Sequence, residues 1–176
     1  LVSLAVDTAT TDEIMSPEFK QAGDKAVLLE VGLQADGSVD FAGAMALYDK
    51  VLAAMRAGKV KAAYAVTAGG VIEAVVKMAL GNGLGFAFDP AAKEALAKAP
   101  VYGSLVVETS DEALLGQGLV LGEITEVTEF TLGNEAITLA AVEEAYTAPL
   151  DAVYKAQVEA ETPLGTAPLY EPAAPH

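Results

Sequence analysis

One stretch of the chain, residues 62–85, joins a strand pattern, a glycine pair, a helix pattern and a second glycine cluster. Ala62–Val66 has the length and apolar character of a buried strand, and Gly69 and Gly70 follow it. After the pair, apolar residues recur at spacings of three and four, which predicts an amphipathic helix. A strand that turns tightly into a helix restricts the chain to folds in which helices pack on a sheet.

The glycine pair is the first candidate binding site. Without side chains, Gly69 and Gly70 let a ligand or another backbone approach the start of the helix. The first turn of a helix has unpaired amides and a partial positive charge, so it can hold a phosphate without a basic side chain. We predict substrate or phosphate binding by Thr67, through its hydroxyl, and by Gly69 and Gly70. The alternative is a tight strand-to-helix turn without a ligand.

The second glycine cluster, residues 81–85, has more glycine than a helix end requires. A C-terminal cap needs one glycine, and this segment has three. The excess predicts a shaped loop, and Asn82 is our fourth candidate for substrate or phosphate binding. The other interpretation, which we favour, is that Asn82 tolerates a left-handed backbone between two glycines.

Composition excludes several classes of function. The 176 residues are 53% hydrophobic, enough for one domain with a core. The net charge of −15 argues against a nucleic-acid surface, and no apolar tract is long enough to cross a membrane. Without cysteine there is no disulfide, thiolate metal site or thiol nucleophile. His176, the only histidine, ends the chain, so we predict no complete set of catalytic residues and expect a cytoplasmic protein.

The remaining patterns alternate between strands and helices. We predict an α/β (α+β) fold, a mixed sheet with helices on its faces. The strand–helix–strand order near residues 103–125 is compatible with a partly ferredoxin-like topology. The expected elements are a surface loop over 7–23, strands over 24–31, 61–66, 84–88, 103–108 and 119–125, helices over 41–57, 71–80, 90–98 and 111–115, a hairpin over 127–138, and two helical pieces over 139–159 broken near Pro149.

The order of these motifs resembles the C-terminal type of domain in the aminoimidazole ribonucleotide synthetase superfamily. The resemblance covers residues 1–160, which we take as one domain. It rests on the motifs Gly69-Gly70, Glu73-Ala74, Met78 and Gly81-Asn82-Gly83, and on segments 1–6, 15–20, 24–29, 103–108 and 121–125. It implies that residues 1–6 form the opening strand and that the fold is that of the superfamily.

Within the superfamily, the chain is most similar to the phosphoribosylformylglycinamidine synthase family. This resemblance implies a part in the ATP- and glutamine-dependent conversion of formylglycinamide ribonucleotide to its amidine, in de novo purine biosynthesis. Glycine turns of this domain type then contact a phosphorylated small-molecule substrate in a shared cleft. The resemblance also implies that other domains of the polypeptide, a nucleotide-binding N-terminal-type domain and a glutaminase domain, are the partners and bind most of the ATP and Mg²⁺. The isolated chain is expected to be inactive.

The chain departs from one branch of that family at two places. That branch has acidic residues where this chain has Ala65 and Ala68, so we predict no metal site here. Two alternatives stay open: a non-catalytic, pseudo-symmetric scaffold or auxiliary nucleotide-holding domain of the same enzyme, and a stand-alone acidic ligand-binding module.

The two ends of the sequence suggest a piece of a longer chain. Leu1 is not methionine and stands in an apparent strand, which we interpret as the start of an excised domain. Residues 161–176 hold half of the eight prolines and are predicted to be a proline-rich linker or tail.

Overall fold

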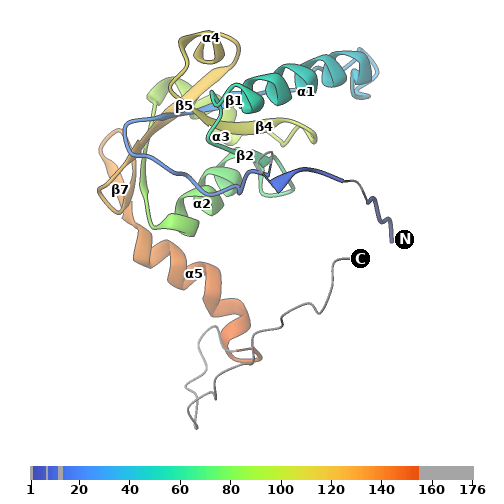
Figure 1. Cartoon of the computed structure of the whole chain (residues 1–176). Helices are drawn as coiled ribbons and strands as arrows, with labels where there is room; N and C mark the ends of the chain where they lie inside the picture. Colours follow the sequence, from blue (N-terminus) through green and yellow to red (C-terminus); the bar gives the residue numbers. More distant parts are fainter. Residues whose placement is uncertain (1, 7, 12–13, 155–176) are drawn as a thin grey trace, which may run out of the picture. The chain divides into compact units, whose positions relative to one another are not determined.

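The computed structural model describes residues 2–6, 8–11 and 14–154 (Figure 1). The predicted domain end at residue 160 and the proline-rich segment 161–176 lie outside these residues. The chain divides into two compact units, residues 1–143 and 144–176, and the division falls within the sequence of helix α5 (Leu139–Asp151). The first unit contains the sheet and all the predicted site residues.

Seven strands form one mixed sheet in the order β2-β4-β1-β5-β3-β6-β7. All neighbouring strands are antiparallel except β3 and β6, which are parallel. The strands are β1 (Lys25–Leu29), β2 (Ala62–Ala65), β3 (Gly85–Phe88), β4 (Leu105–Thr109), β5 (Leu119–Thr125), β6 (Glu129–Leu132) and β7 (Glu135–Thr138). The predicted mixed sheet and the hairpin, β6 and β7, are confirmed.

Strand β1 lies between β4 and β5 and is antiparallel to both. Strands β4 and β5 therefore run parallel to each other, and the short helix α4 (Glu112–Leu115) connects them. This split β-α-β unit is the arrangement expected from the strand–helix–strand spacing.

Helices cover both faces of the sheet (Figure 1). On one face lie α2 (Gly70–Asn82), the 3₁₀ helix η2 (Pro90–Ala92) and α3 (Lys93–Ala97); on the other lie α1 (Phe41–Arg56) and α4. The α1 helix starts where predicted, because the Asp40 side chain accepts a hydrogen bond from the amide of Gly43 at 3.1 Å.

The alternation of side chains along β4 produces two cores. Val106 packs toward α2 with Met78, while Val107 packs toward α1 with Val51. All four are buried, and each such side chain contributes about 1.5–3 kcal/mol through removal from water. The position of α2 over the first core sets where the glycine turns lie.

Two predictions about elements are wrong. Residues 2–6 form no strand: Val2 is 96% exposed, and no strand of the sheet pairs with this segment. An alternating pattern becomes a strand only where a neighbouring strand supplies the hydrogen bonds. Segment 7–23 is not simply a surface loop, because Phe19 is fully buried and stacks on Phe86 with ring centroids 5.6 Å apart.

The break predicted near Pro149 agrees with the end of helix α5, two residues beyond this proline. Helix α5 continues through this proline to Asp151. Because Pro149 stands in the last turn, its missing N–H removes a single backbone hydrogen bond near the helix end. The rest of the predicted second piece, residues 155–159, lies outside the described residues.

Candidate functional site

The glycine pair forms the tight turn between β2 and α2. Gly69 is the N-cap of α2, and the amide of Gly70 donates to the carbonyl of Thr67 at 2.9 Å. Gly70 has a φ of +74°, a left-handed conformation that other residues rarely adopt. The turn thus brings Thr67, Gly69 and Gly70 together, as predicted, at the start of a 13-residue helix.

A carboxylate of the chain itself interacts with this turn. Glu73 Oε2 accepts hydrogen bonds from Thr67 Oγ1 at 2.6 Å and from the Gly69 amide at 2.9 Å. Glu73 Oε1 lies 2.7 Å from Lys77 Nζ, an ion pair between residues four apart on the same face of the helix. Lys77, then Thr67 and Gly69, lower the pKa of Glu73 to about 2. Two of the groups predicted to hold a phosphate, Thr67 Oγ1 and the Gly69 amide, therefore bind the Glu73 carboxylate here, whereas the Gly70 amide donates to the Thr67 carbonyl.

The fourth candidate, Asn82, lies at the other end of α2. It is the last residue of the helix, and its Nδ2 donates to the carbonyl of Phe19 at 2.8 Å. The twelve steps from Gly70 to Asn82 place it about 18 Å from the first turn, so the four candidates do not form one site.

The predicted left-handed backbone at Asn82 is wrong. Gly83 takes that conformation, with φ +67°, and its amide closes the helix on the carbonyls of Ala79 and Leu80. A residue without Cβ pays the smallest penalty there, so the turn falls on the glycine that follows Asn82. Gly81 is helical and Gly85 begins β3, so the cluster is a helix end joined directly to a strand rather than a long loop.

An apolar hollow of about 230 Å³ adjoins the first turn of α2. Ile72 lines it from the helix, and residues of β3, α3 and the β6–β7 hairpin form the other walls. Its apolar walls are Phe88, Leu96, Phe130, Leu132, Ala136 and Ile137, and Thr131 and Glu135 contribute polar groups. The sequence contained no motif for this hollow, because its residues come from separate segments.

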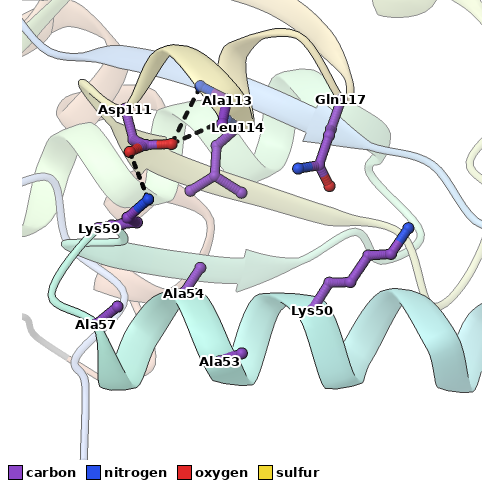
Figure 2. Close-up of a pocket in the computed structure, with 9 residues that line it drawn as sticks. All are labelled: Lys50, Ala53, Ala54, Ala57, Lys59, Asp111, Ala113, Leu114 and Gln117. Carbon is purple, nitrogen blue, oxygen red and sulfur yellow. Dashed lines mark hydrogen bonds and ion pairs between the residues drawn. The ribbon is translucent and has the colours of Figure 1, made fainter.

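A second pocket, of about 310 Å³, lies between α1 and α4 on the other face of the sheet (Figure 2). Asp111 binds Lys59 Nζ at 3.0 Å through Oδ2, and through Oδ1 it accepts the amides of Ala113 and Leu114. Figure 2 shows Lys50 and Gln117 at the end opposite this pair. The pocket is therefore lined by the hydrogen-bond donors of Lys50, Lys59 and Gln117 and by the alanine side chains of α1. It shares no residue with the glycine turns.

The residues at the glycine turn do not fit a magnesium site. Ala65 and Ala68, which are exposed beside the turn, supply no side-chain oxygen ligand, and Glu73 already binds Lys77. Mg²⁺ is normally held by carboxylates together with phosphate oxygens and water. Across residues 2–6, 8–11 and 14–154, no three acidic or histidine side chains gather as metal ligands.

Sequence reasoning also missed two buried carboxyl groups, those of Asp24 and Glu108. Glu108 ends the apolar run Leu105-Val-Val-Glu, and an acidic residue within a buried strand was the available signal. The contacts of this pair extend to Asn82 through segment 14–23.

Comparison with known proteins identifies the fold family. Residues 21–159 match the family described as AIR synthase related protein, C-terminal domain. The chain belongs to this family. The match extends from before β1 to beyond α5 and includes both ends of α2, so the sequence-based expectation of the superfamily is confirmed.

Solved structures from Thermotoga maritima share the fold of this AIR synthase-related domain. PurLQS is 17% identical with a TM-score of 0.63 over 94% of this chain and 32% of that one. PurL complexed with FGAR is 16% identical with a TM-score of 0.61 over 92% and 33%. Phosphoribosylformylglycinamidine synthase II is 18% identical with a TM-score of 0.60 over 92% and 31%. The chain thus spans about a third of the length of these structures.

The other comparison found no match among curated proteins. In the part of the AIR synthase-related domain that the structure describes, no helix has both the length and the apolar character to cross a membrane.

Proposed function

We propose that this chain is a domain of phosphoribosylformylglycinamidine synthase, acting in the ATP- and glutamine-dependent conversion of formylglycinamide ribonucleotide to its amidine. The observation that carries the proposal is the family match over residues 21–159, which includes the whole glycine-turn unit. The fold shared with PurL complexed with FGAR supports it. The proposal places the protein in de novo purine biosynthesis and in the cytoplasm.

The role we assign to the chain is substrate contact by its glycine turns. At the β2–α2 turn, a substrate phosphate would accept hydrogen bonds from Thr67 Oγ1 and the Gly69 amide, in the cleft that this domain shares with another. Glu73 Oε2 must then give up its hydrogen bonds to Thr67 and Gly69. Glu73 can do so and stay paired, because its other oxygen, Oε1, contacts Lys77. Asn82 belongs to a second contact region at the far end of α2.

The chain supplies only part of the reaction in this proposal. It has no cysteine for the release of ammonia from glutamine, so a glutaminase domain is required as a partner. ATP and its Mg²⁺ are assigned to a nucleotide-binding domain of the N-terminal type, because the glycine turn does not fit a magnesium site. The isolated chain is accordingly expected to be inactive.

One observation favours a second function, a non-catalytic scaffold or auxiliary nucleotide-holding domain of the same enzyme. Glu73 already satisfies Thr67 and Gly69, so the turn is stable without a ligand. A pseudo-symmetric copy of the domain that no longer binds substrate would have this property.

The two functions are distinguished by a titration with formylglycinamide ribonucleotide. The mass of the native polypeptide that carries this sequence is measured first, with an antibody raised against the present chain. In that polypeptide, Gly70→Val should raise KM for the ribonucleotide if the turn contacts the substrate. The matched control is Gly116→Val, at a glycine with φ −79° on the other face of the sheet. Unchanged kinetics in a folded Gly70→Val enzyme would support the scaffold. Turnover by the purified fragment alone, or a native chain no longer than the fragment, would contradict both.

A further inference from the structure

Asn82 and Gly83 form the dipeptide in which an asparagine side chain most readily loses ammonia. In that reaction the backbone nitrogen of the following residue attacks the side-chain Cγ, and glycine leaves this nitrogen unhindered because it has no Cβ. Both residues are exposed, so water reaches them. Asn134, the only other asparagine of the chain, precedes Glu135, whose side chain hinders the same nitrogen. Asn82 is therefore the asparagine whose sequence favours deamidation.

The structure holds this dipeptide in an unreactive conformation. Asn82 is the last residue of α2, and closure of a ring through its Cγ requires the following peptide to rotate out of the helical arrangement. The hydrogen of the Gly83 amide is directed to the carbonyls of Ala79 and Leu80, where it closes the helix. A nitrogen whose hydrogen is bonded in this way is not free to lose its proton and attack.

A contact from outside the helix fixes the side chain as well. Asn82 Nδ2 donates to the carbonyl of Phe19 at 2.8 Å, and the Phe19 amide donates to the carbonyl of Met78 at 2.9 Å. Phe19 belongs to residues 14–23, which we call the docking segment, and its buried ring stacks on Phe86. The nitrogen that would leave as ammonia is thus the atom that joins α2 to the docking segment.

The docking segment is in turn held by a carboxyl group far away in the sequence. Glu108, which is buried on β4, accepts the amides of Lys20 at 2.7 Å and Gln21 at 2.9 Å through its two oxygens. These two residues directly follow Phe19, so their hydrogen bonds keep its carbonyl in place against the end of α2. The conformation of Asn82 therefore depends on contacts made outside its own helix.

We propose that Asn82-Gly83 is a deamidation site that the docking segment keeps closed. The site opens when this segment and the end of α2 separate locally. The Gly83 nitrogen then loses its proton and bonds to Cγ of Asn82, the Cγ–Nδ2 bond breaks, and the leaving nitrogen takes up a proton and departs as ammonia. Water opens the resulting cyclic imide at either carbonyl. The products are aspartate and isoaspartate, in which the chain runs through the side-chain carbon.

The reaction releases the docking segment irreversibly. Nδ2, the donor to Phe19, is replaced by an oxygen, which repels the carbonyl oxygen that Nδ2 bound. The new negative charge stands at the C-terminus of a 13-residue helix, where the partial charge of the helix is also negative. Any effect on substrate contact by Asn82 rests on the proposed function, whereas the deamidation itself does not.

The first test is the rate of deamidation in the folded and the urea-unfolded chain at one pH and temperature. Mass spectrometry follows it in the tryptic peptide 78–93, in which Asn82 is the only asparagine. The folded chain should react at least about tenfold more slowly, because opening breaks the hydrogen bonds of Asn82 Nδ2 and of the Gly83 amide. Equal rates in the two states would overturn the proposal.

A variant isolates the contribution of the docking segment. Glu108→Ala removes the acceptor that holds this segment and leaves the sequence of α2 unchanged. Asn82 should then deamidate about tenfold faster or more, since a hydrogen bond to a charged group is worth at least about that factor. The matched control is Glu30→Ala, which removes an exposed carboxylate and should leave the rate unchanged. Equal rates in Glu108→Ala and Glu30→Ala would refute control by the docking segment.

The consequence is tested with the product variant, which does not depend on the folding of Glu108→Ala. Asn82→Asp should lower the hydrogen-exchange protection of the Phe19 and Lys20 amides by about tenfold, through the lost hydrogen bond and the charge at the helix end. Asn134→Asp makes the same change in the exposed β6–β7 turn and should leave this protection unaltered. Full protection in Asn82→Asp would contradict release. Because no ribonucleotide is used, failure here is distinguishable from failure of the proposed function.

Discussion

Glu73 Oε2 accepts the amide hydrogen of Gly69 at 2.9 Å, so the start of α2 is capped by a side chain from its own first turns. The contact resembles a capping box, in which a side chain of the first turn reaches back to the N-cap amide. It also means that any phosphate at this turn competes with an intramolecular carboxylate. The strength of that competition is measurable.

Removal of Glu73 should improve anion binding at the turn. In Glu73→Ala, Thr67 Oγ1 and the Gly69 amide lose their partner, and a negative charge is removed from the site. Because charges at a helix N-terminus are worth about 0.3–1 kcal/mol, we expect inorganic phosphate to bind about two- to fivefold more tightly. Calorimetric titration measures this, with the exposed Glu94→Ala as the control. No difference between the two variants would mean that the turn does not bind anions.

Glu73 should also contribute to acid sensitivity. Its pKa is about 2 in the folded chain against an ordinary value of 4.5, so the unfolded state takes up a proton first as the pH falls. The stability contributed by the Lys77, Thr67 and Gly69 contacts is therefore fully present above pH 4.5 and is lost between that pH and about 2. Urea unfolding over this range should show a smaller acid loss in Glu73→Gln. Parallel profiles in the two proteins would contradict the assignment.

Phe19 should be essential for stability although it stands in an irregular segment. The ring is fully buried and stacks on Phe86, so Phe19→Ala leaves a cavity and should cost about 3–5 kcal/mol in the free energy of unfolding. Phe41, which is 74% exposed, provides the control: Phe41→Ala should change stability by less than about 0.5 kcal/mol. Similar losses in urea denaturation of the two variants would show that the segment is not docked.

At Gly70 there is room for a side chain, but the backbone conformation disfavours one. A Cβ there would meet no atom within 4 Å, yet φ is +74°, so Gly70→Ala should lose about 1–2 kcal/mol through backbone strain alone. At Gly116 the φ is −79°, and a Cβ would make ordinary contacts with the nearest atom 3.6 Å away. Gly116→Ala should therefore be neutral or slightly stabilising in thermal unfolding. Equal stability of Gly70→Ala and Gly116→Ala would mean that the backbone at Gly70 does not disfavour a side chain.

The elements that the sequence predicted are those with strong local signals. Helix α1 has a complete periodic stripe with Asp40 at its start and Gly58 after its end, and the β6–β7 hairpin is centred on Gly133 and Asn134. These patterns depend on residues within a few positions of one another. The strand expected over residues 1–6 failed because its pattern required a partner strand, and the described residues 2–6 have none.

The candidate site was predictable only in part. The glycine pair predicted a tight turn before a helix, and the structure contains this turn, with Gly70 in the left-handed region. Whether that turn binds a substrate remains a prediction. That Glu73 would reach back to Thr67, and that Asn82 would bind Phe19 at the opposite end of the helix, depended on side-chain positions that no motif specifies.

The sequence by itself determined the local structure, the mixed α/β architecture and the family, because periodicity, caps and glycine turns act over short distances. Only the tertiary structure decided which irregular residues are buried. Lys20 and Glu108 are 88 positions apart, and Asn82 and Phe19 are 63 apart. Contacts over such separations form only after the sheet and α2 have brought the segments together, and the energy of a buried carboxyl group or ring depends on all its neighbours at once.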